Sequence, residues 1–333
     1  MEDNLLQECH SVDLSEDILN AMDGEVLAIL LRDHTTGRNI TWATRDYEYL
    51  GKGYMYGDEI IPERITGENN RIIVPRVLKT RSSQTQRAKE MAEVFTPSWV
   101  CNAQNNLIDE AWFGNKNVFN TEMTTEAGVR TWVPSDSPIS IFPEGKTWKA
   151  YVRDTRMEIT CGEAPYLVSR YDATTGEPIP INKRIGLLDR KLRLVSENTE
   201  TSGEWLSFAQ EAFQNIYGYE WQGDNLLLAR ENLLISFIEY YAAKFGKLPM
   251  TKSTAYIAYI VSWNLWQMDG LKGVVPDSCH EQVTTDLFGG ETRMPCLGCK
   301  DGNIRRHNGT YCLIKDWRAK KEKQKIRFVD LIK

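Results

Sequence analysis

The chain has 333 residues, of which 41% are apolar and 26% are charged, an ordinary composition for one large α/β domain or for two domains. Its formal net charge of −6 argues against a protein that binds nucleic acid over most of its surface. No apolar run reaches the length of a membrane span, and the acidic start lacks the parts of a signal peptide. We therefore expect a cytoplasmic protein with no membrane contact.

Residues 1–88 mix short helical and strand-like stretches with polar turns and predict an N-terminal extension without motif chemistry. The next element is sharply marked. Thr96 is a good N-cap, Pro97 suits the first helical position, and apolar residues recur at helical spacing up to about Trp112. Residues 114–145 are rich in Thr, Ser and Pro and predict a polar loop.

From residue 148 the pattern alternates between helix and strand. A short helix precedes a strand at 156–160, and a small-residue turn then opens a new element at Tyr166. After a long polar stretch at 170–200, the predicted elements are a helix at 204–214, a strand at 216–221, helices at 224–241 and 253–261, and a strand at 264–268. This alternation predicts a parallel sheet covered on both faces, as in a doubly wound α/β fold.

Each predicted strand ends near a carboxylate. Glu158 is followed by a turn of small residues, in which backbone N–H groups can approach a ligand closely. Glu220 ends the second strand, where an acidic side chain can accept hydrogen bonds from ribose hydroxyls, and Asp269 ends the third. We expect these carboxylates to face one crevice at the edge of the sheet. The alternative for each motif is an ordinary connection between a strand and a turn.

A compact set of thiols and an imidazole lies near the C-terminus, with the pattern Cys296-x2-Cys299-x7-His307-x4-Cys312. These four ligands suit a tetrahedral structural zinc ion, in an element that resembles a stretched zinc knuckle. The alternative is reduced cysteines in a surface loop. The tail is basic, and it is either a solvated segment or a strip that contacts phosphates. Its cations are Lys315, Arg318, Lys320, Lys321, Lys323, Lys325 and Arg327.

Four ordered segments resemble the gamma class of N6-adenine DNA methyltransferases. Phe95-Thr96-Pro97 resembles the motif that precedes the first core strand of that family, and Glu158 to Leu167 is similar to its motif I. Tyr217 to Arg230 and Leu265 to Asp269 look like its second and third motifs. The resemblance covers a little over half of the chain and implies a Rossmann-like core that binds S-adenosylmethionine.

The resemblance also implies roles for individual residues. Phe95, Thr96 and Pro97 would lie near the methionine part of the cofactor, Glu220 at its ribose and Asp269 near its adenine. The core turn around the cofactor would comprise Glu158, Cys161, Gly162 and Ala164.

The catalytic half of the family pattern is missing, because the sequence has no Asn-Pro-Pro-Tyr or Asp-Pro-Pro-Tyr. These tetrapeptides accept hydrogen bonds from the flipped adenine and stack on it. Asn264 is the substitute candidate, although the pattern places it at the start of its strand, whereas a catalytic Asn belongs at the far end.

Two functional hypotheses follow from the resemblance. The chain is a DNA methyltransferase (M) subunit of a bacterial restriction-modification or phage-defence system. Alternatively, it is a non-catalytic cofactor- or DNA-binding subunit that completes a split methyltransferase or scaffolds a defence complex. Both imply DNA and a second protein subunit as partners. An oxidoreductase is disfavoured because no G-x-G-x-x-G follows a candidate strand. The expected segments are an extension at 1–88, the core at 89–275, and a zinc-binding element with the basic tail at 276–333.

Overall fold

The structure is a computed structural model that describes residues 11–13, 15–22, 24–91, 93–285, 288 and 291–332. It has a mixed α/β fold with a small parallel sheet of three strands, in the order β3 (Arg156–Ile159), β4 (Ile216–Glu220) and β5 (Leu265–Gln267). Both neighbouring pairs are parallel. The predicted strands are confirmed to within one residue at each end.

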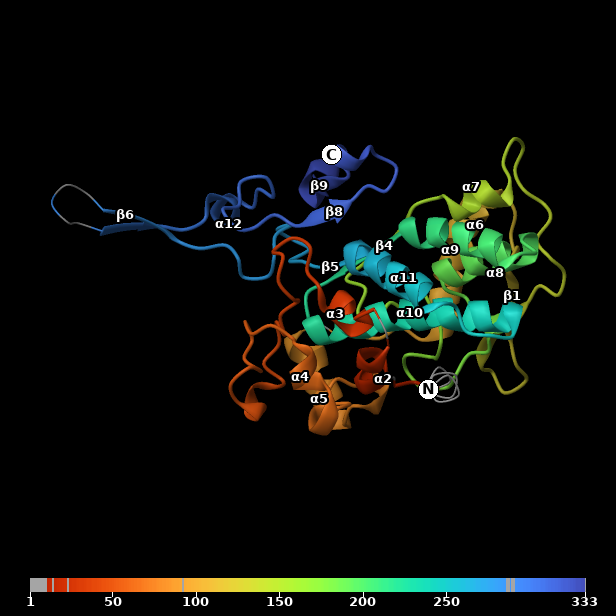
Figure 1. Cartoon of the computed structure of the whole chain (residues 1–333), viewed down its shortest axis with the longest axis horizontal. Coiled ribbons are helices and arrows are strands. Elements are labelled where there is room, and N and C mark those ends of the chain that lie inside the picture. The colour runs from red at the N-terminus through yellow and green to blue at the C-terminus, as the bar shows by residue number, and fades with distance from the viewer. Residues whose placement is uncertain are drawn as a thin grey trace.

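Four long helices lie on one face of this sheet and supply much of the core (Figure 1). Helix α10 is buried through most of its length, because apolar residues occupy all of its sides. Three of these helices were predicted, whereas α8 lies in the stretch expected to be polar. The four are α8 (Leu187–Asn198), α9 (Ser202–Gln214), α10 (Gly223–Phe245) and α11 (Thr251–Asn264).

The N-terminal part packs onto the same helices, and apolar residues such as Leu30 and Trp42 belong to the same core cluster as α10 and α11. The N-terminal part contacts the central helices directly, since α3 packs against α11. The elements of this part are α2 (Glu16–Ala21), α3 (Val26–Leu31), η1 (Glu48–Leu50), α4 (Pro62–Ile65), η2 (Gly67–Asn69), η3 (Arg76–Leu78) and α5 (Arg81–Glu90).

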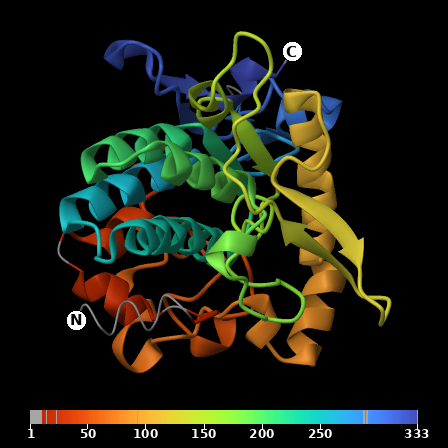
Figure 2. The same ribbon diagram turned by 90° about the vertical axis from the view of Figure 1, so that its right-hand side faces the viewer.

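Helix α6 (Ser98–Phe113) runs across the direction of helices α8 to α11 (Figure 2). It forms where the sequence predicts a helix, but Pro97 occupies the N-cap position that was expected for Thr96. The predicted polar loop that follows contains an antiparallel hairpin of β1 (Asn120–Thr124) and β2 (Arg130–Pro134). Helix α7 (Trp148–Val152) then leads into β3, as predicted.

No α-helical layer from the described part of the chain covers the second face of the sheet, which corrects the prediction of a doubly covered sheet. It is covered in part by the hairpin of β8 (Leu313–Lys315) and β9 (Lys325–Arg327), where Ile314 and Phe328 pack against Tyr219 and Trp266. No α-helix follows the turn after β3 until α8 begins, because residues 160–186 contain only the short 3-10 helix η4 (Ile181–Lys183), another departure from the expected pattern. None of the described helices combines the length and apolar character needed to cross a membrane.

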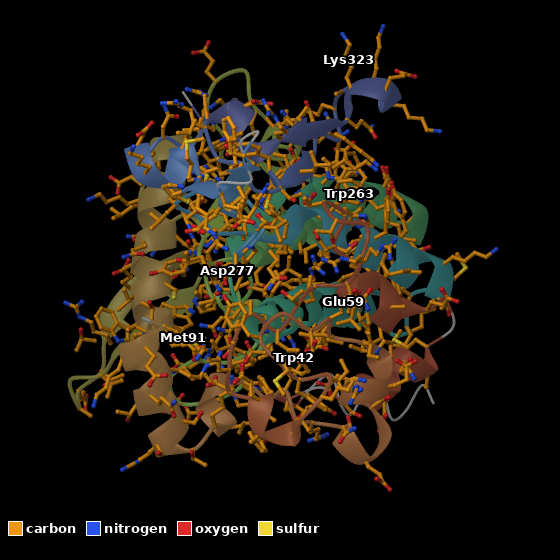
Figure 3. The ribbon with its side chains drawn as sticks, turned by 90° about the vertical axis from the view of Figure 1, so that its left-hand side faces the viewer. Trp42, Glu59, Met91, Trp263, Asp277 and Lys323 are labelled. Carbon is orange, nitrogen blue, oxygen red and sulfur yellow. The ribbon has the colours of Figure 1, made fainter. Side chains whose placement is uncertain are left out.

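A second C-terminal hairpin, formed by β6 (Gln282–Thr285) and β7 (Glu291–Met294), projects away from the helical body (Figure 1). The remaining short elements are η4 (Ile181–Lys183), α12 (Leu297–Asp301), η5 (Lys321–Lys323) and η6 (Phe328–Leu331). Figure 3 shows Lys323 of the basic tail at the margin of the molecule, far from Trp42 in its interior.

Candidate ligand pocket and metal centre

A pocket of about 870 Å³ lies at the carboxyl ends of β3 and β4. In parallel α/β sheets this edge is where ligands bind, and the volume suits a ligand of nucleoside size. Six residues singled out from the sequence line the pocket: Phe95, Thr96, Glu158, Cys161, Gly162 and Glu220. The structure therefore brings the segment before α6 together with the ends of two strands.

The turn after β3 has an unusual backbone. Thr160, Gly162 and Ala164 have φ values of 51°, 53° and 63°, all in the left-handed region. Glycine adopts this region freely, but a β-branched residue such as Thr160 does so at a cost of about 1–2 kcal/mol. Thr160 and Gly162 line the pocket. Strain of this kind gathers at binding sites, where the surrounding structure holds the backbone in place.

Two buried carboxylates hold this turn in shape. Glu158 accepts hydrogen bonds from the backbone N–H groups of Tyr166 and Leu167, at 3.4 and 3.2 Å. Glu220 accepts from the N–H of Gly162 at 2.9 Å and from that of Gln222 at 3.2 Å. Burial raises the pKa of both carboxyl groups, and the charge of Glu220 adds to the rise at Glu158. The two strand ends are thereby tied to the turn between them.

Phe95 closes the pocket over the turn. A Cβ atom built on Gly162 would lie 3.7 Å from the Phe95 ring, so the ring and the glycine are in close contact. The guanidinium of Arg76 lies 5.1 Å from the centre of the same ring. Pro97 and Ala164 do not line the pocket, since Pro97 caps α6 and Ala164 is fully buried behind the turn.

The opposite wall was not anticipated from the sequence. Trp221 lines the pocket and donates a hydrogen bond from Nε1 to the Tyr56 hydroxyl at 2.9 Å. Asn225 at the start of α10 donates to Glu93 at 3.0 Å, and both belong to the lining. The sequence does contain one signal for this wall, because Trp221 follows Glu220 directly. An aromatic ring at the end of a strand can stack on a flat ligand.

Buried Arg87 organises that wall. It pairs with Glu93 at 2.6 Å and Asp224 at 3.0 Å, and also contacts Asp46. Burial disfavours the charged form of Arg87, but these carboxylates outweigh it and raise its pKa. A buried cation that satisfies several carboxylates fixes their positions, so the wall is preorganised.

Two predicted site residues lie elsewhere. Asn264 is at the amino end of β5, the end opposite the pocket, and its amide donates to the carbonyl oxygens of Phe213 and Ile216 at 2.9 Å each. Asp269 follows β5 but does not line the pocket. It accepts from Leu271 N and pairs with Lys272 at 3.0 Å, so it shapes the local turn.

The C-terminal region contains a cluster of three cysteines and one histidine that could hold a metal ion such as zinc. The Sγ atoms of Cys279, Cys296 and Cys299 lie 3.5, 3.6 and 3.6 Å from His307 Nδ1. All four ligand atoms lie within 4.8 Å of one another. Tetrahedral zinc, with bonds of about 2.3 Å to sulfur and 2.0–2.1 Å to nitrogen, requires S···N separations of about 3.6 Å.

The fourth ligand differs from the prediction. Cys279 occupies the place expected for Cys312, whose buried Sγ instead donates to the carbonyl oxygen of Gln267 at 3.3 Å. Burial disfavours the thiolate of Cys296, but hydrogen bonds from Asn308 N and Cys299 N outweigh it and lower its pKa to about 6. Thiolates are the form of cysteine that binds zinc.

No known protein-family model, curated protein or solved structure matches this chain. The evidence for its function therefore comes from the geometry of these two sites.

The metal centre lies at the base of the projecting hairpin. Cys279 comes just before β6 and Cys296 just after β7, so a bound ion would join the two ends of the hairpin. Asn308 strengthens this junction because it exchanges hydrogen bonds with the backbone of His280, at 3.2 and 2.7 Å. The arrangement has the closed ligand set of a structural metal site.

Proposed function

We propose that this chain is the cofactor-binding subunit of an S-adenosylmethionine-dependent N6-adenine DNA methyltransferase from a restriction-modification or phage-defence system. The observation that supports the proposal best is the pocket between β3 and β4. Its lining unites Phe95-Thr96, the Glu158–Gly162 turn and Glu220, the same segments that resemble the family's cofactor motifs. The fold proposed with it is the first half of a Rossmann-like core, in which three strands follow one another across the sheet.

The residues present fit such a cofactor. Glu220 ends β4 and would accept hydrogen bonds from ribose hydroxyls, while the Gly162 turn allows close approach of the backbone. Trp221 and Tyr166 line the pocket and offer rings for the adenine, and Phe95 and Thr96 would contact the methionine part. When bound, the cofactor supplies a methyl group for direct transfer to the exocyclic amine of adenine.

The chain is proposed as a subunit because the described pocket contains no group that would hold the target base. The family tetrapeptide is missing, and Asn264 lies at the wrong end of the sheet with its side chain fully engaged. The Oδ1 atom of Asn264 accepts a hydrogen bond from Trp317 Nε1 at 2.8 Å. Asn264 is therefore not placed to contact a base at the carboxyl edge of the sheet. A second chain would therefore supply the groups that hold the flipped base.

Zinc would act structurally in this proposal. Bound by Cys279, Cys296, Cys299 and His307, it would fasten the β6–β7 hairpin to the body of the protein. The hairpin and, separately, the basic tail would then be available for contacts with DNA or with the second subunit.

The test is a calorimetric titration of the purified chain with S-adenosylmethionine. We expect binding of one equivalent by the wild type and at least roughly tenfold weaker binding by Glu220→Ala, which loses the ribose acceptor. Glu211→Ala is the matched control, because Glu211 pairs with Arg153 on the surface. Absence of binding by the wild type would refute the cofactor proposal.

A second assay tests whether the chain needs a partner for catalysis. The chain alone, incubated with labelled cofactor and DNA of mixed sequence, should transfer no methyl group to the DNA. Methylation by the isolated chain would show that it is a complete enzyme and would refute this part of the proposal.

A further inference from the structure

The parallel sheet has one covered edge and one open edge. At β5, the side chain of Gln267 exchanges hydrogen bonds with the backbone of Thr41, at 2.9 Å in each direction. At β3, no strand of the described part of the chain pairs with the outer side. The backbone N–H of Arg156 donates to Asn215 O, on the side of β3 that faces β4. Because the backbone groups of successive residues in a strand point to opposite sides, the N–H and C=O groups of Met157 and Ile159 point away from β4, toward the open edge.

The side chains of the same two residues are exposed. Met157 retains 37% and Ile159 66% of its accessible surface, although both lie in a strand of the central sheet. Strands of parallel sheets are ordinarily covered on both faces, and native proteins avoid an open apolar edge because it invites pairing with another chain. An exposed edge with apolar side chains therefore marks a surface that is covered in the functional assembly.

A cavity of about 300 Å³ continues this surface on the face that Met157 shares with Tyr217 and Trp266. The C-terminal segment forms its other wall, and Leu331 at its margin is 55% exposed. The lining is mainly apolar, with the side chains Met157, Tyr217, Trp266, Ile314, Trp317, Ile326, Phe328 and Leu331. A strand added beside β3 would direct alternate side chains to this face.

Cations border the cavity without carboxylate partners in the described contacts. Arg318 donates to Asn215 Oδ1 at 2.6 Å, and Lys315 donates to the Tyr259 hydroxyl at 3.1 Å. Asp316 also lines the cavity, but its Oδ1 accepts from the backbone N–H of Arg318. Two cations and one carboxylate line the cavity, so its charged margin is net positive and favours an occupant with both apolar and acidic side chains.

We infer that a strand of a second polypeptide, with alternating apolar side chains and an acidic flank, adds to β3 in the parallel direction. Its main chain pairs with the outward groups of Met157 and Ile159, and its apolar side chains enter the 300 Å³ cavity. A parallel strand ends at the carboxyl edge, so the residues after it reach the open side of the pocket beside Thr160. That these residues hold the target base rests on the proposed function, whereas the docking edge rests on the geometry of β3.

The test uses photo-crosslinking of the full chain in the cells that naturally make it. Benzoylphenylalanine replaces Leu331 at the cavity margin, and Ile141, which is 74% exposed and does not line the cavity, serves as the control position. We expect an adduct from position 331 to one segment of a second polypeptide, with apolar alternation and acidic neighbours. The control position should give no such adduct.

Substitutions at Met157 decide whether strand pairing forms the contact. Met157→Pro removes the outward donor and leaves the β4 ladder intact, so the adduct should fall by at least roughly tenfold. Met157→Thr keeps the donor and should retain the adduct. If circular dichroism shows that the proline variant is unfolded, Met157→Asp replaces it, since it puts a carboxylate into the apolar cavity, offsets the positive charge of Arg318 and repels the acidic flank, and should cause the same loss.

Several results would overturn the inference. They are an adduct that survives Met157→Pro or its replacement, an adduct with a second copy of this chain or with nucleic acid alone, and no adduct at all. The cofactor titration separates this inference from the proposed function, because Met157 does not line the ligand pocket and its variants should bind S-adenosylmethionine normally. Crosslinking without cofactor binding would refute the proposed function and leave the docking edge standing.

Discussion

Gly298 lies inside the metal cluster and allows its histidine to take the ligand position. A Cβ atom at residue 298 would lie 2.6 Å from both the backbone N and the Nδ1 of His307, whereas ordinary contacts begin at 3.4 Å. In Gly298→Ala, His307 must therefore move by about 0.8 Å. Metal–ligand distances tolerate deviations of only about 0.2 Å, so the alanine variant loses its imidazole ligand.

We expect Gly298→Ala to weaken zinc binding by at least roughly 10–100-fold, which corresponds to about 1.4–2.7 kcal/mol. The assay is a competition titration against a chromophoric zinc chelator at pH 7. Gly203→Ala is the matched control, because no atom lies within 4 Å of the new methyl group. Zinc affinity within twofold of the wild type in Gly298→Ala would refute the structural reasoning about this centre.

Three further predictions concern the metal ligands, the strained turn and the N-terminal core. Cys279→Ser should lose bound zinc and Cys312→Ser should keep it, as measured by metal analysis after dialysis; the opposite result would restore Cys312 as the ligand. Thr160→Gly should raise the free energy of unfolding by up to about 1 kcal/mol through relief of the left-handed strain, and urea unfolding showing a loss instead would contradict that reading. Burial raises the pKa of Glu16 from 4.5 to about 8. Between these pH values the folded state retains a proton that the unfolded state releases, so the free energy of unfolding should fall as pH rises. The fall amounts to at most about 5 kcal/mol, and Glu16→Gln should flatten it in urea titrations at pH 5 and pH 8; equal pH dependence in both proteins would count against the burial argument.

The sheet could be predicted because its signals are local. Each strand is short, ends near an acidic residue and alternates with a helix, so β3, β4 and β5 follow from the order of residues alone. The pocket followed for the same reason, since the carboxyl ends of parallel strands meet at one edge. Glu158 and Glu220 therefore lie together as predicted, with Gly162 between them.

Helix α8 was missed because its sequence contains charges that proved to be buried. Arg190 pairs with Asp109, and Lys191 donates to the carbonyl oxygens of Val152 and Asn215 at 3.1 and 3.2 Å. Burial lowers the pKa of Lys191 well below its usual value. These partners lie far away in the sequence, so the stretch looks like a solvated loop until the fold brings them together.

The fourth metal ligand could not be predicted from spacing. Cys279 precedes Cys296 by the whole β6–β7 hairpin, and only the antiparallel pairing returns the chain to the same point. Cys312 has the more compact spacing, but it comes just before β8 and its thiol faces β5. The wall formed by Arg87, Glu93 and Asp224 escaped prediction for a similar reason, since α5 and α10 are distant in the chain.

The proposed function requires the pocket between β3 and β4 to bind S-adenosylmethionine. Ultraviolet photolabelling with the radiolabelled cofactor, followed by peptide mapping, tests the ligand and its location together. We predict that the label attaches to peptides containing Phe95, Tyr166 or Trp221 and is displaced by excess S-adenosylhomocysteine. Saturable labelling confined to peptides outside this lining, or no specific labelling, would contradict the assignment of the pocket to S-adenosylmethionine.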